Sequence, residues 1–357
     1  MIDVVDLFCG AGGLTAGLRA AGLSVRAGYD IERQCKYAYE KNNNATFVDK
    51  DVTQVSADEL MSWYCAGNYR LLAGCAPCQP FSSYNQGKDT RSDRKWPLLY
   101  AFSRLIKETE PHLVTMENVP DVTKHEVYRD FVEDLVKLGY SVWANPVHCI
   151  DYGLPQQRRR HVLLASKLGP IDLIAPTHAG MPVTVEETIS KLSSLAAGEC
   201  DPQDPLHRAA SLTNINLKRI MHSKPGGTWK DWPEYLVADC HRKVSGKTYP
   251  SVYGRMRPDA PSPTMTTLCY GFGNGRFGHY DEAQARAISL REAAMLQSFP
   301  RDYEFMPPDQ ITFKAVGRMI GNAVPVRLGE VIGESLNRHV AKYEALQAAA
   351  GIARNPA

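Results

Sequence analysis

The sequence lacks the features that mark membrane, secreted and strongly charged proteins. No apolar run approaches the roughly 18 residues that a membrane-spanning helix needs. The first residues, Met1–Asp6, carry no basic segment ahead of an apolar core, so we expect no signal peptide. The sequence also has almost no excess of one charge over the other, because its 41 Lys and Arg residues nearly equal its 39 Asp and Glu residues.

A disulfide framework and a metal site are also not expected. The nine cysteines are odd in number and scattered among apolar neighbours, which favours a reduced, cytoplasmic setting. Cys75 and Cys78 have CxxC spacing, but no second CxxC or pair of histidines accompanies them, so we expect no metal.

The first half of the 357 residues alternates strand-like and helix-like segments. This alternation predicts an α/β fold with a parallel sheet and helices on both faces. The expected strands are 4–8, 25–29, 47–48, 71–74, 113–116, 141–147 and 161–165, and the expected helices are 14–21, 34–41, 98–109 and 127–138.

The character of the chain changes near Lys167, where proline, glycine, serine and histidine become frequent. Between Pro205 and Arg257 ten Lys and Arg face three Asp and Glu, a local excess of +7. Helical patterning returns over 283–299 and 315–346. We therefore expect a large α/β lobe built from both ends of the chain, with a small irregular domain inserted: 1–166, 167–285 and 286–357.

A glycine-rich loop follows the first expected strand and opens the first expected helix. Its sequence runs Asp6-Leu7-Phe8-Cys9-Gly10-Ala11-Gly12-Gly13, and acidic residues follow at Asp30 and Asp51. Glycines allow close backbone approach to a cofactor, and an acidic residue about 20 positions on commonly accepts ribose hydroxyls. A tight turn without a ligand and a nicotinamide dinucleotide site are the alternatives. The loop lacks GxGxxG spacing, which favours a nucleoside without phosphates, most commonly S-adenosylmethionine.

The segment Gly74-Cys75-Ala76-Pro77-Cys78-Gln79 ends an apolar strand-like run and exposes a thiol. Glu117-Asn118 ends the next such run, so a carboxyl group and a thiol are expected at neighbouring strand ends. A thiolate adding to a ring, with a carboxylic acid on a ring nitrogen, is one interpretation. A redox pair or two buried thiols, with Glu117 as a surface carboxylate, are the others.

Three arginines, Arg158, Arg159 and Arg160, precede a further apolar strand. In extended backbone Arg158 and Arg160 point to one face and Arg159 to the other. A solvated charge run is the alternative, but the adjoining core strand favours a substrate-facing pair.

In this order the motifs resemble those of the cytosine-C5 DNA methyltransferases. The resemblance covers 3–165 and 286–335 and implies a Rossmann-like S-adenosylmethionine-dependent methyltransferase sheet with an inserted target-recognition domain. The matching motifs are the glycine loop, Pro77-Cys78-Gln79, Glu117-Asn118-Val119, Gln156-x-Arg158-x-Arg160, Arg291-Glu292 with Leu296-Gln297-Ser298-Phe299-Pro300, and Gly321-Asn322-Ala323-Val324-Pro325.

The resemblance implies catalytic roles. Cys78 would attack C6 of a cytosine flipped out of double-stranded DNA. Glu117 would hold N3 and the exocyclic amine, Arg160 would contact O2, and Arg158 would support the loop or backbone. Asn118 and Gln79 would help to orient the site.

The resemblance also implies cofactor and DNA contacts. S-adenosyl-L-methionine would be converted to S-adenosyl-L-homocysteine. The expected cofactor-binding residues are Phe8, Gly10, Gly12, Gly13, Asp30, Ile31, Asp51, Val52, Pro77, Leu98 and Asn322. The expected DNA-contacting residues are Ser82, Arg242, Lys243, Arg255, Arg257 and Thr264. Trp229, Trp232 and Tyr235 are expected to form a small core of the inserted domain.

Small departures from the family pattern do not endanger activity: Ser289 replaces a frequent threonine, and Arg159 adds a charge. A same-fold enzyme acting on transfer RNA would carry Cys-Phe-Thr after its Glu-Asn motif, which this chain lacks. A binding protein without catalysis would have lost Cys78, Glu117 or an arginine of the pair. We expect a monomeric, cytoplasmic modification enzyme of bacterial or phage type, without a preceding regulatory domain. A partner restriction endonuclease is possible, and the sequence leaves its existence open.

Overall fold

The computed structural model describes residues 1–77, 96–244 and 248–351. Contacts between Cα atoms divide the chain into two units, each described here by itself. The first unit comprises Met1–Cys149, Arg159–Pro176 and Val324–Ala357, and the second comprises Ile150–Arg158 and Thr177–Ala323.

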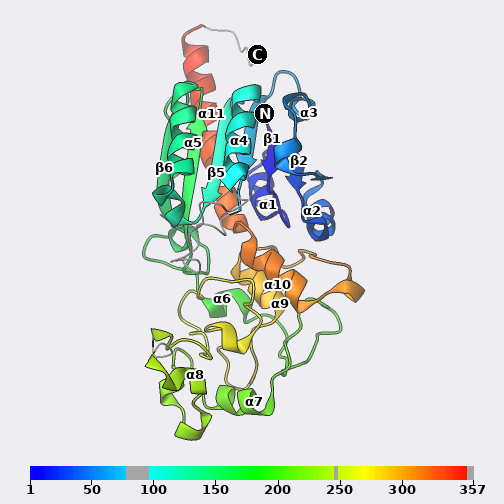
Figure 1. Cartoon of the computed structure of the whole chain (residues 1–357), viewed down its shortest axis with the longest axis vertical. Coiled ribbons are helices and arrows are strands. Elements are labelled where there is room, and N and C mark those ends of the chain that lie inside the picture. Colours follow the sequence, from blue (N-terminus) through cyan, green and yellow to red (C-terminus); the bar gives the residue numbers. More distant parts are fainter. Residues whose placement is uncertain (78–95, 245–247, 352–357) are drawn as a thin grey trace. The chain divides into compact units, whose positions relative to one another are not determined.

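A seven-stranded sheet forms the centre of the first unit (Figure 1). Its strand order is β3-β2-β1-β4-β5-β7-β6. The strands are β1 (Ile2–Leu7), β2 (Ser24–Asp30), β3 (Thr46–Asp49), β4 (Tyr69–Gly74), β5 (Leu113–Asn118), β6 (Ser141–His148) and β7 (Arg159–Ser166). The order reverses between β1 and β4, and in open α/β sheets ligands bind beyond the carboxyl ends of strands at such a point.

The expectation of a purely parallel sheet is wrong at one strand. β7 pairs antiparallel with both β5 and β6, whereas the pairs from β3 to β5 are all parallel. The connection from β6 to β7 contains no crossover helix on the sheet, so the chain returns in the opposite direction. As a result, the start of β7 meets the end of β5, and Asn118 lies opposite His161.

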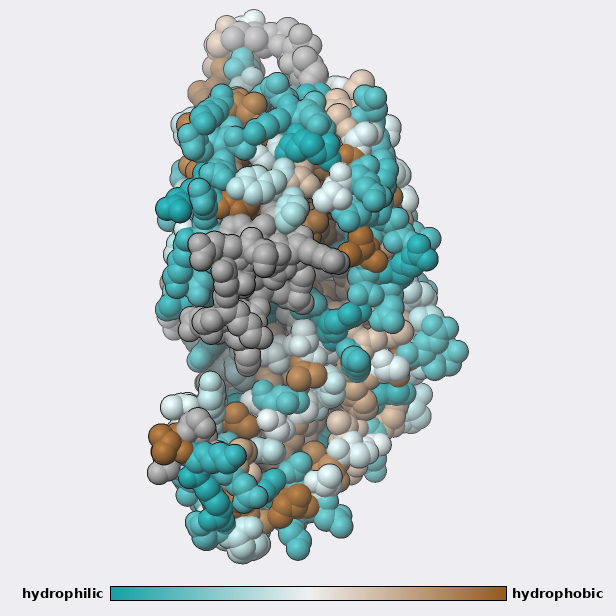
Figure 2. Space-filling model, in the orientation of Figure 1, coloured by the Kyte–Doolittle hydropathy of each residue, from teal (hydrophilic) through white to brown (hydrophobic). Residues whose placement is uncertain are grey.

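Helices cover both faces of this sheet. The helices of the first unit are α1 (Gly13–Ala20), α2 (Lys36–Asn43), α3 (Ala57–Met61), α4 (Trp96–Thr109), α5 (Glu126–Lys137) and α11 (Val326–Ala349). Val5 and Leu7 of β1 belong to one buried cluster with Phe102 of α4 and Phe131 of α5. Side chains alternate along a strand, so Asp6 between them faces the layer of α1. The outer surface over α4 and α5 is largely hydrophilic (Figure 2).

The long helix α11 packs directly on α1. A Cβ atom added at Gly17 would lie 2.2 Å from the carbonyl oxygen of Val326, and one added at Gly329 would lie 2.9 Å from that of Leu14. Only glycine permits this backbone approach. A late segment of the chain therefore completes the helical layer over the first strand.

The second unit consists mostly of loops and short helices. These are α6 (Val185–Ile189), α7 (Asn214–Met221), α8 (Asp239–Arg242), α9 (Leu290–Leu296) and α10 (Phe313–Asn322). The helix expected over 283–299 is confined to α9, where Ser289 and Glu292 form a capping box. The helix expected over 315–346 is divided by Pro325, which ends the turn after α10 and caps α11.

Trp229 and Trp232 form part of a small core in the second unit, as expected. They are 8% and 6% exposed and cluster with Ile220, Leu236 and Phe272. The same expectation is wrong for Tyr235, which is 70% exposed. In this division of the chain α9 and α10 belong to the second unit, and the three expected domains remain a prediction.

Candidate active site

The glycine loop between β1 and α1 has an open, strained backbone. Phe8, Gly10 and Gly12 adopt left-handed conformations, with φ of 59°, 50° and 88°. Gly12 is the N-cap of α1 and offers no side chain to the first amides of the helix. A Cβ atom added at Gly10 would meet nothing within 4 Å. The N-terminus of α1 therefore has no side-chain cap, and the loop before it leaves open space at Gly10, as a cofactor-binding loop requires.

Asp30 is hydrogen-bonded to this loop. Its Oδ2 accepts from the Gly10 amide at 2.8 Å, and its Oδ1 accepts from the Glu32 amide at 2.8 Å. Burial raises the pKa of the Asp30 carboxyl group, and these amide donors oppose the increase. Two acidic oxygens are thus fixed at the end of β2, each with remaining acceptor capacity.

Asp6 and Thr15 form a buried pair beneath the loop. Thr15 Oγ1 donates to Asp6 Oδ2 at 2.7 Å and lies 3.1 Å from Tyr39 Oη. Asp6 Oδ1 is buried and has no hydrogen-bond partner among the described residues. Burial, together with the nearby charge of Asp30, raises the pKa of Asp6 to about 7. No role for Asp6 or Thr15 was expected from the sequence, although the position of Asp6 at the end of a buried strand could have suggested one.

The other expected cofactor residues differ in exposure. Asp51 Oδ1 accepts from Thr53 N and Thr53 Oγ1, capping a 3₁₀ turn whose first residue, Val52, is buried. Ile31 is 67% exposed, so an apolar surface is open to a ligand after β2. Leu98 and Pro77 are half-buried, and Asn322, in the second unit, is exposed.

Asn118 holds the loop that follows β4. Its Nδ2 donates to the carbonyl oxygen of Ala76 at 3.0 Å, and its Oδ1 accepts from the amide of Val119 at 2.9 Å. Burial raises the pKa of the neighbouring Cys75 thiol, with the charge of Glu117 adding to the effect. Cys75 is therefore kept as a neutral thiol. Cys78, Gln79 and Ser82 lie outside the described residues.

Glu117 and Arg160 pair at the ends of β5 and β7. Arg160 Nε lies 2.7 Å from Glu117 Oε1, and their side chains are 14% and 9% exposed. Glu117 Oε1 accepts no aligned hydrogen bond from the described residues. The arginine supplies charge while the carboxylate keeps acceptor capacity for a ligand, which suits recognition of a ring amine.

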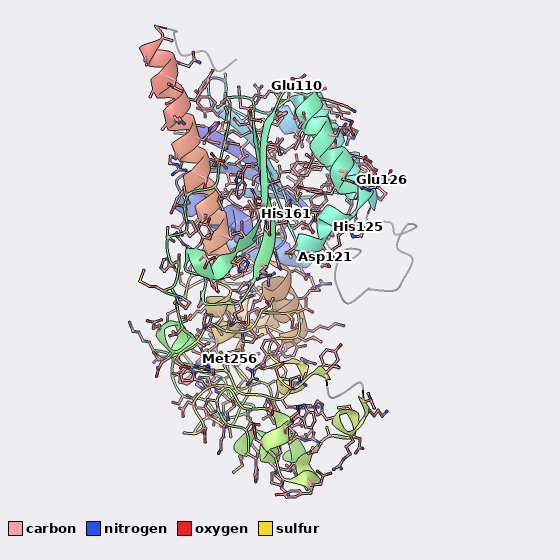
Figure 3. The ribbon with its side chains drawn as sticks, turned by 90° about the vertical axis from the view of Figure 1, so that its left-hand side faces the viewer. Glu110, Asp121, His125, Glu126, His161 and Met256 are labelled. Carbon is pink, nitrogen blue, oxygen red and sulfur yellow. The ribbon has the colours of Figure 1, made fainter. Side chains whose placement is uncertain are left out.

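His161 follows Arg160 on β7, so its side chain points to the opposite face of the sheet, where it contacts α5. His161 Nε2 lies 2.6 Å from Tyr128 Oη, and the two rings pack edge to face. Figure 3 shows His161 on β7 near the start of α5, where Asp121 and His125 also lie. Burial lowers the pKa of His161, so this histidine stays neutral beside Arg160. The sequence analysis did not identify this pair.

Arg158 belongs to the second unit and contacts backbone there. Its Nη1 donates to the carbonyl oxygen of Met265 at 3.1 Å, and its Nη2 donates to that of Gly321 at 3.2 Å. Arg158 is 3% exposed, whereas Arg159 is exposed. Arg158 thus supports loops of its own unit.

The expected DNA-contacting residues fall into different environments. Arg242 pairs with Glu234, and Arg257 pairs with Asp259 at 2.7 Å, both on the surface of the second unit. Lys243 is exposed, and Thr264 Oγ1 donates to the carbonyl oxygen of Gln157 at 2.6 Å.

Arg255 does not fit its expected role in DNA contact. It is 0% exposed, and its guanidinium donates to backbone carbonyl oxygens that include those of Ile220, Ser223 and His279. Seven such bonds connect the segment of Arg255 to two others, 220–223 and 279–284. The positive charge of Arg255 therefore organises the second unit, and we withdraw it as a phosphate ligand.

In 1–77, 96–244 and 248–351 no group of three His, Cys, Asp or Glu side chains could hold a metal ion. Among the helices of that part of the chain, none has the length and apolar character needed to cross a bilayer.

The sheet and the strand-end residues define a Rossmann-like methyltransferase fold. Two solved structures share it: a methyltransferase of Entamoeba histolytica, EhMeth (TM-score 0.67, 16% identity, 95% of this chain and 99% of that one), and DNMT2 of Spodoptera frugiperda (TM-score 0.66, 16% identity, 94% and 100%).

Proteins with similar sequences indicate the family of methyltransferases. The type II methylase M.HgiDII of Herpetosiphon aurantiacus is 53% identical over 94% of this chain and 95% of its own length. The type II methyltransferase M1.HphI of Haemophilus parahaemolyticus is 31% identical over 94% and 86%. The model of the C-5 cytosine-specific DNA methylase family matches residues 2–338, and the chain belongs to this family of DNA cytosine-5 methyltransferases.

Proposed function

We propose that the protein methylates C5 of a flipped cytosine in a specific double-stranded DNA sequence, using S-adenosyl-L-methionine and a covalent Cys78–C6 adduct. The observation that carries the proposal is the buried pair of Glu117 and Arg160, with Asn118 bonded to the loop that leads to Cys78. A carboxylate and a guanidinium at neighbouring strand ends suit a pyrimidine that must be activated for addition at C6.

The first unit fits the cofactor. The N-terminus of α1, which has no side-chain cap, the fixed carboxylate of Asp30 and the capping carboxylate of Asp51 suit a nucleoside with two ribose hydroxyls and an amine. Asp6 Oδ1, which is buried beneath the loop and has no hydrogen-bond partner among the described residues, places an acidic group near a cofactor that carries positive charge. The other proposed contacts are Phe8, Gly12, Gly13, Ile31, Val52, Pro77 and Leu98, with Asn322 toward the methionine end. When bound, the cofactor supplies the methyl group.

Each residue of the proposed site has its own role in the reaction. The thiolate of Cys78 forms a bond to C6 while Glu117 accepts hydrogen bonds from the exocyclic amine and from N3 once this nitrogen carries a proton, and Arg160 contacts O2. Electron density moves to C5, which takes the methyl group. A base, which water can provide, accepts the C5 proton as the Cys78–C6 bond breaks, and this step regenerates the thiolate and leaves 5-methylcytosine. Gln79 helps to orient the loop of Cys78.

The second unit carries the proposed DNA contacts. Arg242, Lys243 and Arg257 are surface cations suited to phosphates, which supply affinity without sequence information. Thr264 of this unit and Ser82, which follows Cys78 in the sequence, complete the set. The type II relatives support a role as the modification enzyme beside a separate restriction endonuclease. We propose that the enzyme acts as a monomer in the cytoplasm.

A direct test combines methylation with trapping. DNA from cells expressing the protein is sequenced after bisulfite treatment, which identifies the methylated cytosine and its sequence context. The purified protein is then incubated with cofactor and a duplex carrying 5-fluorocytosine at that position. We expect a denaturation-resistant protein–DNA adduct, because fluorine cannot leave as the proton does. Methylation of the natural duplex without an adduct on the fluorinated one would contradict attack by Cys78.

A further inference from the structure

Two glutamines of the second unit, Gln156 and Gln297, form a buried relay of side-chain amides. Gln156 Nε2 donates to Gln297 Oε1 at 2.7 Å, and Gln297 Nε2 donates to the carbonyl oxygen of Ala323 at 2.7 Å. Gln156 Oε1 in turn accepts from the amide of Met265 at 2.9 Å and from Arg158 Nη1 at 3.3 Å. We call Gln156, Gln297 and Arg158 the amide relay.

Both glutamines of the relay are buried, so water cannot replace the hydrogen bonds of their side-chain amides. Gln156 and Gln297 are 0% exposed. Gln297 must accept from one neighbour and donate to the other, which an amide does and a carboxylate or a hydrocarbon does not. Replacing it with an apolar side chain would leave Gln156 Nε2 and the Ala323 carbonyl oxygen without their bonds to it.

Both ends of one exposed turn are held by the relay. Gln297 binds the carbonyl oxygen of Ala323, while Arg158 Nη2 binds that of Gly321 at 3.2 Å. Between them stands Asn322, whose side chain is exposed at the end of α10. The turn also lies close to another backbone segment, because a Cβ atom at Gly321 would be 2.3 Å from the amide of Thr267. The backbone on each side of Asn322 is thus fixed while its side chain stays available.

We infer that Gln297 is a positioning residue: it fixes the turn Gly321–Ala323 and thereby sets the position from which Asn322 binds the cofactor. The inference rests on the proposed function, in which Asn322 contacts the methionine end. A purely structural role for Gln297 would instead affect how much protein folds and leave the affinity of the folded protein for its cofactor unchanged.

Isothermal titration calorimetry with S-adenosylmethionine and S-adenosylhomocysteine separates these roles. We expect Gln297→Met to raise Kd and the cofactor KM about tenfold, equivalent to about 1.4 kcal/mol. The kcat at saturating cofactor, per folded protein, should stay close to that of the wild type. Gln310→Met is the matched control, since Gln310 is exposed in the same unit, and it should change neither quantity. An unchanged Kd with a lower melting temperature would overturn the inference.

A double-mutant cycle with Asn322→Ala tests the route of the effect. Asn322 is exposed, so this variant should fold and bind the cofactor more weakly. Adding Gln297→Met to Asn322→Ala should raise Kd by a much smaller factor than Gln297→Met does in the wild type. Both changes act through the same contact, the one that Asn322 makes with the cofactor. Additive losses of affinity would contradict the inference. Failure of the wild type itself to bind the cofactor would contradict the proposed function instead, so the two failures are distinguishable.

Discussion

Arg160 Nε lies 2.7 Å from Glu117 Oε1, at the ends of the antiparallel strands β7 and β5. The pair depends on the reversal of β7, which brings the beginning of one strand beside the end of another. Hydrogen bonding does not saturate the carboxylate, because Oε1 accepts no aligned bond from the described residues. The arrangement therefore holds two opposite charges ready for a polar ring.

Removing the cation should impair both stability and methyl transfer. Arg160→Met leaves the Glu117 carboxylate enclosed without its counter-charge, a change that commonly costs about 3–5 kcal/mol for buried pairs. We expect a lower urea midpoint and a large loss of kcat in a methylation assay. Arg159→Met is the control, because Arg159 is exposed on the same strand. Equal effects of the two changes would contradict a specific role for the pair.

Cys78→Ala should abolish methyl transfer and leave cofactor binding near that of the wild type. The change removes the attacking thiolate, while the proposed cofactor contacts remain. Methylation is measured with radiolabelled cofactor and binding by calorimetry. Cys75→Ala serves as the comparison, because burial holds the Cys75 thiol in its neutral form and we expect this variant to remain active. Undiminished methylation by Cys78→Ala would rule out the covalent route.

Arg255→Met should destabilise the protein, whereas Arg257→Met should not. The first change removes seven hydrogen bonds to backbone carbonyl oxygens in the interior. Each unsatisfied buried group costs about 1–3 kcal/mol before relaxation. Arg257 lies on the surface, where substitutions usually stay within about 0.5 kcal/mol. Thermal unfolding followed by circular dichroism measures both, and a stable Arg255→Met protein would disprove the organising role.

The carboxyl group of Asp6 should make stability fall as pH rises toward neutrality. Its folded pKa is raised to about 7 from an ordinary value of 3.8, so the folded state binds more protons between those values. The contribution is fully present below pH 3.8 and is lost as pH rises through about 7. Urea titrations of Asp6→Asn between pH 5 and pH 8 should show a smaller decrease than the wild type. Parallel curves would contradict the raised pKa.

Gly17→Ala should disrupt the packing of α1 on α11. A methyl group there would lie 2.2 Å from the carbonyl oxygen of Val326 and 2.5 Å from the amide of Glu330, so the helices must separate. We expect a clear drop in melting temperature, although alanine favours helix formation by about 1 kcal/mol relative to glycine. Ala16→Gly, at the neighbouring, half-buried position, isolates the propensity effect. Increased stability of Gly17→Ala would mean that the helices do not approach so closely.

The strands and helices of the first half were predictable because their apolar period is regular. Strand β1, helix α1 and the acidic residue Asp30 all lie within a residue or two of their expected places. The reversed direction of β7 was not predictable, because the apolar run Val162–Ala165 reads the same in either direction. Strand polarity depends on the connection, and the loop 150–158 has no periodic signal.

The site was predictable where a residue acts through its own chemistry. Glu117 and Arg160 could be selected as a carboxylate and a cation at strand ends, and the structure brings them together. Arg255 was misjudged because an arginine in a basic segment looks the same whether it faces solvent or backbone carbonyls. Gln156 and Gln297 lie 141 positions apart, so their bond follows from tertiary structure alone.

The close crossing of α1 and α11 has a consequence for synthesis of the protein. Gly17 emerges from the ribosome about 300 residues before Val326, a delay of about 15–60 s at ordinary translation rates. Throughout that interval the groove on α1 has no helix to fill it, and the apolar residues beside it face solvent. The first unit can therefore complete its fold only after α11 has been synthesised.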